Sequence, residues 1–283
     1  MRRFLPYFPF LLLLLAAPVA AQETAKPEPP QHTFLWKVER EGLATSWLFG
    51  TIHVPDDRIN ALHPAVKAAL EGADAFYGEL ALDSTEELGK QVLAAGTFEE
   101  GHDLREVVSD ELWERLDQRL QKHGMSAAML RRFKPFLVNL TLVQLDMLPL
   151  IQSGKKALDE RIFLVAKAKG KEVGGVEQVE EQIQALAYTL TLEESVASLS
   201  QGLDDMDKAD ARGVSDLERI MRAWLTGSGR LLLAIGMESW DLNDPVDQRS
   251  RKALLLDRNV HMAERTARKL TQAPEKSFVF AFG

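Results

Sequence analysis

Residues 46–53 read Ser-Trp-Leu-Phe-Gly-Thr-Ile-His, a short apolar run that ends in a glycine and is followed three residues later by a histidine. The apolar run predicts a β-strand. Gly50 would let the backbone turn tightly or approach another group closely. His53 is therefore expected just beyond the carboxyl end of this strand, where ligands bind in open α/β sheets.

The segments around this strand predict the start of a sheet. Residues 34–39 and 44–49 are apolar runs separated by a short polar link, which is typical of a β-hairpin. Residues 64–70 predict a helix that begins with a proline, and residues 75–80 predict the next strand. This strand, helix, strand order indicates a right-handed crossover between parallel strands. If the two strands are neighbours in the sheet, the residues that follow them project from the same edge.

The rest of the chain is mainly helical in pattern. Helices are predicted from Thr85 onward, with a short strand at residues 172–176 and a last strand at residues 277–282. Asp244 is a good N-cap for one long helix that runs to about residue 270. We therefore expect an α/β fold, with a mixed β-sheet flanked by helices and a large helical insertion.

Composition excludes several classes of function. The net charge of −8, without a long basic stretch, and an aromatic content of 7% argue against nucleic acid as a partner. Cysteine is absent, which excludes disulfides, thiolate zinc sites, iron–sulfur clusters and cysteine nucleophiles. Any metal ion must therefore be held by His, Asp or Glu side chains.

Residues 1–21 have the pattern of a signal peptide: Arg2 and Arg3, then an apolar run, then the small residues Val-Ala-Ala at 19–21. The alternative is an uncleaved membrane anchor, but three prolines interrupt the apolar stretch. We expect cleavage, no stable membrane span afterwards, and an exported protein that is periplasmic or secreted. Residues 22–31 then predict a flexible tether, and residues 32–283 a single α/β domain.

Three polar residues follow predicted strands. His53 follows the first crossover strand, Glu79 lies at the end of residues 75–80, and Glu177 follows residues 172–176. A histidine and a carboxylate at one sheet edge can share a metal ion or act as an acid/base pair. Two alternatives stay open: His53 could bond a loop carbonyl, and Glu79 could be a helix N-cap or a surface acid.

Arg258 is a further candidate because it follows the apolar turn Leu254-Leu255-Leu256 on the predicted late helix. A polar side chain in such surroundings needs a partner, which an acidic site could supply. The alternative is an ordinary surface arginine. None of the remaining histidines lies at a strand end, and we expect them to be structural or solvated: His32, His63, His102, His123 and His261.

Taken together, these segments resemble the TraB/PrgY/GumN family, which includes the Tiki metalloproteases. The resemblance covers nearly the whole chain after residue 32, in order, and rests on the following blocks: residues 34–39, 48–54, 74–79, 175–177 with Glu181-Gln182, and 257–259 with Met262-Ala263.

The resemblance implies a fold related to the erythromycin esterase and ChaN type, and a divalent metal ion, manganese or cobalt. Tiki-like members use two Gly-x-x-His motifs and a Glu. His53 and Glu79 match the first motif and the acid as metal ligands. The second motif is represented only by Gly283, where the sequence stops. We expect either a fragment of a longer protein or a site that has lost one ligand.

Two functions follow from these residues. The first is an exported metal-dependent hydrolase, a peptidase in which Glu177 is the general base and Arg258 steadies the oxyanion or the substrate carboxylate. The second is a non-catalytic envelope protein that binds and sequesters a signalling peptide. A structural role in envelope polysaccharide export is a weaker third option, suggested only by the GumN name.

Overall fold

The computed structural model describes residues 28–82 and 85–283. The expected signal peptide at 1–21 and residues 22–27 of the expected tether lie outside the described residues. Five strands form one sheet in the order β1-β2-β5-β3-β4. Their bounds are β1 Leu35–Val38, β2 Ser46–Gly50, β3 Ala75–Gly78, β4 Glu172–Gly175 and β5 Phe278–Phe282.

The sheet is mixed, as predicted. β1 and β2 form the expected antiparallel hairpin, whereas β2, β5, β3 and β4 are parallel to one another. β2 and β3 are parallel, as predicted, but they are not neighbours, because β5 lies between them and pairs with both. The last strand along the chain is therefore the middle strand of the sheet.

Alternate side chains of the strands enter two separate cores. Phe76, Val279 and Ala281 belong to a cluster on the face covered by α2 and α8. Phe278 and Phe280 belong to the opposite face, which α14 covers with Met262 and Leu270. Because successive strand residues point to opposite faces, a strand that is apolar at every position is buried on both sides.

The helices between the strands fall into three groups. Between β2 and β3 lie α1 Asp57–Asn60 and α2 Pro64–Gly72. Between β3 and β4 lie α3 Thr85–Gly96, α4 Leu104–Val107, α5 Asp110–Gln121, η1 Ala127–Leu130, α6 Pro135–Asp146, α7 Leu148–Gln152 and α8 Leu158–Ala168. Between β4 and β5 lie α9 Val179–Ala187, α10 Leu192–Arg212, α11 Asp216–Leu225, α12 Gly229–Gly236, α13 Pro245–Arg251, the π-helical turn η2 Lys252–Leu256 and α14 Asp257–Gln272.

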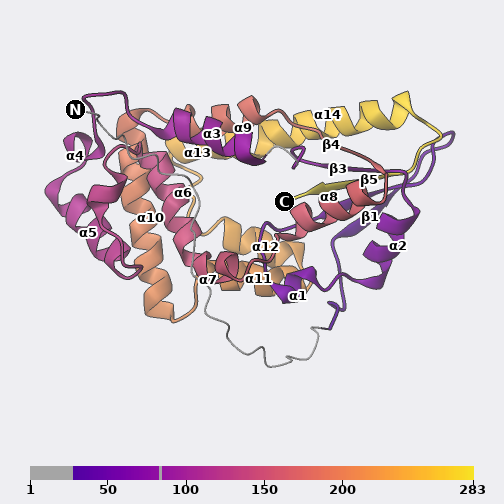
Figure 1. Cartoon of the computed structure of the whole chain (residues 1–283), viewed down its shortest axis with the longest axis horizontal. Helices are drawn as coiled ribbons and strands as arrows, with labels where there is room; N and C mark the ends of the chain where they lie inside the picture. Colours follow the sequence, from indigo (N-terminus) through magenta and orange to yellow (C-terminus); the bar gives the residue numbers. More distant parts are fainter. Residues whose placement is uncertain (1–27, 83–84) are drawn as a thin grey trace, which may run out of the picture.

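The expected helical insertion forms its own lobe. In Figure 1, α4, α5, α6 and α10 stand on the left, away from the strands on the right. This lobe has a separate core that includes Leu116 of α5, Leu142 of α6 and Leu199 of α10. Two inserted segments far apart in the sequence therefore build one helical unit beside the sheet.

Several helix boundaries differ from the predictions. The apolar residues 135–150 are divided at Met147 into α6 and α7. The long helix expected from Asp244 to about residue 270 contains the π-turn η2. The helix α12 was not predicted. Within residues 28–82 and 85–283, no helix has the length and apolar content needed to cross a bilayer.

Candidate active site

Four parallel strands end at one edge of the sheet and bring the candidate residues together. His53 comes three residues after β2, Glu79 directly after β3, and Glu177 two residues after β4. The backbone N–H of Glu177 donates to the carbonyl of Glu79 at 2.7 Å, which joins two of these strand ends. The central strand β5 ends at Phe282, and Gly283 follows it at the same edge.

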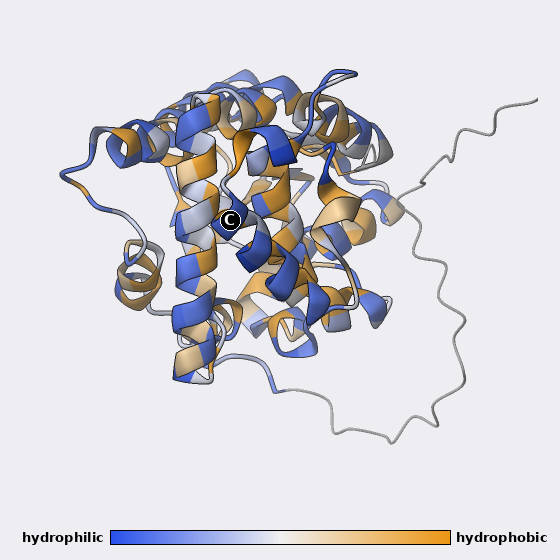
Figure 2. Cartoon of the chain, turned by 90° about the vertical axis from the view of Figure 1, so that its left-hand side faces the viewer, coloured by the Kyte–Doolittle hydropathy of each residue, from blue (hydrophilic) through white to orange (hydrophobic). Residues whose placement is uncertain are grey.

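Gly283 lies between the imidazole and the carboxylate. Its N–H donates to Oε1 of Glu79 at 2.8 Å. A Cβ atom built on Gly283 would lie 2.9 Å from Nε2 of His53. The end of β5 is near the centre of the molecule in both views (Figures 1 and 2). His53 and Glu79, 26 residues apart in the sequence, thus converge on one residue of the sheet edge.

Arg258 bridges the two glutamates. Its Nε and Nη2 donate to the two carboxylate oxygens of Glu177 at 2.8 and 2.6 Å, and Nη2 also donates to Oε2 of Glu79 at 2.8 Å. The side chain of Glu177 is 2% exposed and that of Glu79 is 13% exposed. The Glu177 carboxylate raises the pKa of Arg258 above its already high usual value. The acidic partner expected for Arg258 is therefore present.

The π-turn η2 precedes Arg258 directly. The N–H of Asp257 donates to the carbonyl of Lys252, five residues earlier. The Nη1 atom of Arg258 donates to the carbonyl of Leu254 at 3.2 Å. Single π-turns inside α-helices occur frequently at functional sites, where the extra residue changes the direction of the side chains that follow.

Asp159 contacts the other side of His53. Its Oδ2 lies 2.9 Å from Nδ1 of the imidazole, and its side chain is 11% exposed, compared with 57% for His53. The hydrogen bond to Asp159 raises the pKa of His53, and partial burial of the ring opposes this effect. Oδ1 of Asp159 is buried without a hydrogen-bond partner among the described residues.

The sequence did not point to Asp159, and it singled out Gln182 only as part of a block of the family resemblance, without a role in the site. Asp159 stands in the first turn of α8 beside Glu160, and acidic residues are common there because they favour the helix dipole. Gln182 donates from Nε2 to Oε2 of Glu177 at 3.0 Å and to Oε2 of Glu79 at 3.3 Å. For a glutamine on an amphipathic helix, no sequence pattern distinguishes hydrogen bonding to the site from exposure to solvent.

The charge of the cluster is suited to a cation. Asp159, Glu79 and Glu177 supply three carboxylates against one guanidinium, which leaves a net charge of −2 with a neutral imidazole. A divalent ion would offset this charge, and imidazole and carboxylate groups are its usual ligands. Among the described residues, however, no three His, Asp or Glu side chains gather as a metal-binding group. His53 and Glu79, the two ligands expected from the sequence, therefore do not belong to such a group.

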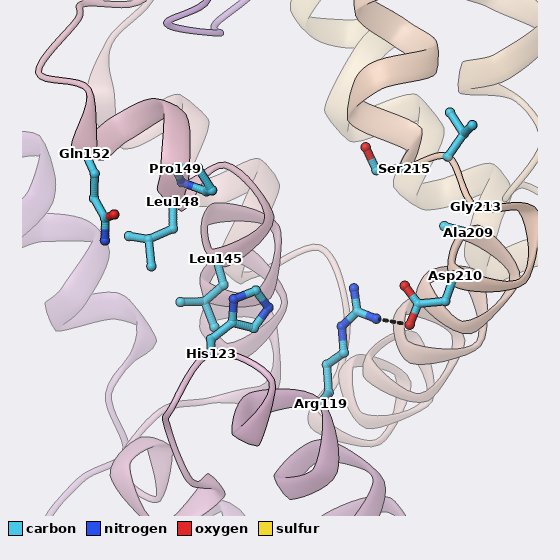
Figure 3. Close-up of a pocket in the computed structure, with 11 residues that line it drawn as sticks. Arg119, His123, Leu145, Leu148, Pro149, Gln152, Ala209, Asp210, Gly213 and Ser215 are labelled. Carbon is cyan, nitrogen blue, oxygen red and sulfur yellow. Dashed lines mark hydrogen bonds and ion pairs between the residues drawn. The ribbon is translucent and has the colours of Figure 1, made fainter. Parts of the chain in front are cut away.

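A cavity lies elsewhere, in the helical lobe. It has a volume of about 510 Å³, and its lining residues come from α5, α6, α7, α10 and the turn before α11. Figure 3 shows Arg119 paired with Asp210 across this cavity, at 2.8 Å. None of the lining residues belongs to the cluster at the strand ends.

Comparisons with known proteins place this arrangement in a family. The relatives include a metalloprotease TIKI homolog from Nematostella vectensis, 26% identical over 95% of this chain and 66% of its own length. Metalloprotease TIKI1 from Xenopus tropicalis is 26% identical, over 99% of this chain and 63% of its own. Metalloprotease TIKI1 from Homo sapiens is 25% identical, over 94% and 60%.

The chain thus spans less than two thirds of the length of these relatives. No solved structure matches it. The family model for the TraB/PrgY/gumN family matches residues 34–283, which include every strand and every residue of the cluster. The chain belongs to the TraB/PrgY/gumN family.

Proposed function

We propose that this chain is a metal-dependent hydrolase that cleaves peptide bonds at the carboxyl edge of its sheet. One observation carries the proposal: His53 and Glu79 converge on Gly283 within a cluster of net charge −2. The relatives named metalloproteases support the same chemistry, since the match covers the strand ends that supply these residues.

His53 and Glu79 are the side chains that would hold the ion, through Nε2 and the carboxylate respectively. Manganese or cobalt is the ion that we propose. When bound, a divalent ion supplies Lewis acidity, which activates water and polarises a carbonyl group. Further ligands would be water molecules or groups of the substrate.

The contacts favour a positioning role for Glu177 rather than the general-base role expected from the sequence. Both carboxylate oxygens of Glu177 already accept hydrogen bonds from the Arg258 guanidinium, which holds the carboxylate in place. We propose that Glu177 fixes Arg258, and that Arg258 holds Glu79 in place and balances its charge. To act as a base, Glu177 would first have to separate from Arg258.

The location and boundaries of the protein belong to the proposal as well. We propose that residues 1–21 direct export and are removed, so that one domain of residues 32–283 acts in the periplasm or outside the cell. Its fold would be related to that of erythromycin esterase and ChaN. Amino-terminal sequencing of the exported protein should begin at Gln22; a protein retained with Met1 would contradict the export step.

The test is peptide cleavage by the purified full-length protein with added manganese or cobalt, followed by mass spectrometry. We expect His53→Ala and Glu79→Ala each to lower kcat/KM by at least about 100-fold, because even indirect contacts to metal ligands are worth 10- to 100-fold. His102→Ala is the control, since this exposed histidine pairs with Glu106 in the helical lobe.

Two outcomes would contradict the proposal. Full activity in either His53→Ala or Glu79→Ala would show that the substituted residue is not needed for catalysis. Peptide binding that survives a chelator, with no cleavage products, would instead support the non-catalytic peptide-binding alternative.

A further inference from the structure

We propose that Asp159 is a positioning residue that holds His53 as the Nδ1–H tautomer and leaves the Nε2 lone pair facing Gly283 and Glu79. The tautomer and the ring orientation follow from contacts of this chain alone. The consequence for metal affinity rests on the function proposed above.

The first argument is which atom of the Asp159–His53 pair donates the hydrogen bond. A charged carboxylate can only accept, so the Nδ1 atom at 2.9 Å from Oδ2 of Asp159 must be the donor. A neutral imidazole has one N–H, and Nε2 is then the unprotonated nitrogen. Because Nε2 is the atom that faces Gly283, the lone pair points to the residue that also bonds Glu79.

The second argument is the burial of Asp159. Its side chain is 11% exposed, and Oδ1 is buried without a partner among the described residues. Burying a carboxylate with one unsatisfied oxygen is unfavourable. As a charge at the helix N-terminus, Asp159 duplicates its partly exposed neighbour Glu160. The contact that distinguishes Asp159 from Glu160 is the one to His53.

The third argument is the exposure of the imidazole. The His53 side chain is 57% exposed and follows the strand in a loop, so packing alone leaves its ring orientation weakly fixed. A carboxylate anchored on a helix supplies the missing constraint. Carboxylate contacts to the second nitrogen of metal-binding histidines serve this purpose in general.

The test uses Asp159→Asn, which keeps the shape but loses the charge, and whose amide can donate to Nδ1 as well as accept from it. The control is Glu160→Gln, which removes a charge from the same helical turn, where Glu160 pairs with Lys156 rather than with His53. The readout is the tautomer of His53 in the metal-free full-length protein, from two-bond nitrogen–hydrogen NMR correlations at a pH where the ring is neutral. His53→Gln identifies the signal.

We expect Nδ1–H in the wild type and in Glu160→Gln, and a shift toward Nε2–H in Asp159→Asn. Manganese affinity, measured by titration calorimetry, should fall about 10- to 100-fold in Asp159→Asn and remain unchanged in Glu160→Gln. An Nε2–H tautomer in the wild type would overturn the proposal without any variant. Unchanged tautomer and affinity in Asp159→Asn would overturn it as well.

Failure of the proposed function is distinguishable from failure of this inference. A wild type that binds no manganese and cleaves no peptide would contradict the hydrolase, while the tautomer comparison would still decide the role of Asp159. A hydrolase whose His53 tautomer is independent of Asp159 would keep the proposed function and remove this positioning role.

Discussion

At the scale of single residues, Arg258 balances two carboxylates that are almost removed from water. Glu177 and Glu79 both accept from it, at 2.6–2.8 Å. We expect Arg258→Met to lower the free energy of unfolding by about 3–5 kcal/mol, because it leaves buried charges without their partner. Arg258→Lys should lower the free energy of unfolding by less, because lysine keeps the positive charge. Some loss remains, because lysine lacks the planar guanidinium group that bonds both carboxylates. Urea unfolding measures both changes.

The matched control is Arg222→Met on α11. Arg222 also pairs with a glutamate, Glu218, at 2.6 Å, but its side chain is 66% exposed. Exposed pairs of this kind contribute about 1 kcal/mol or less. Equal losses of unfolding free energy in Arg258→Met and Arg222→Met would show that burial does not determine how much the Arg258 contacts stabilise the fold.

At the same scale, the sequence could predict the residues that follow strands but not those that approach from helices. His53, Glu79 and Glu177 were found because parallel strands end at one edge. Arg258 was found because a charged residue after three leucines needs a partner. Asp159 has no such mark, since its contact with His53 depends on how α8 packs against the sheet.

At the scale of elements, local patterns predicted strands and helices better than their arrangement. The hairpin of β1 and β2 is set by neighbouring residues and was predicted correctly. The position of β5 between β2 and β3 depends on pairings across about 200 residues, which no local pattern contains. Likewise, the 3.6-residue periodicity of residues 245–270 cannot reveal the extra residue in the π-turn η2.

Glu181 joins two elements beside the site, α9 and α14. It accepts from the N–H of Gln178 at the start of α9 and from both Nη atoms of Arg265 on α14, at 2.5–2.8 Å. The Arg265 contact lowers the pKa of Glu181 to about 2, from an ordinary 4.5. Because the folded pKa is the lower one, this contribution is complete above pH 4.5 and is lost as the pH falls toward 2.

We therefore expect Glu181→Gln to be less stable than the wild type at pH 6, and the difference to shrink at pH 3. The glutamine can still cap α9, so the variant removes mainly the contact with Arg265. Chemical denaturation at both pH values measures the difference. If the difference in stability between the wild type and Glu181→Gln is the same at pH 6 and pH 3, the charge of Glu181 does not contribute to stability.

At the scale of the whole molecule, the site lies between units with separate cores. The cores on the two faces of the sheet and the core of the helical lobe share no buried residue among those described. In the lobe, α6 contacts α3 and α9, and α9 begins two residues after Glu177. Movement of the lobe would therefore change access to the strand ends while the sheet that positions His53 and Glu79 stays intact.

Because their cores are separate, we expect the helical lobe and the sheet to unfold locally and independently of each other. Substitution of one matched leucine in each core tests this. Leu116 in the helical lobe and Leu158 against the sheet are both fully buried on helices. Each change to alanine should cost about 2–5 kcal/mol through the lost contacts and the cavity left behind. In hydrogen exchange, Leu116→Ala should speed the amides of α5 and α10 but not those of β2 and β5, and Leu158→Ala should do the reverse. If both variants accelerate exchange equally throughout, the lobe and the sheet open as one unit, and lobe movement cannot control access to the site.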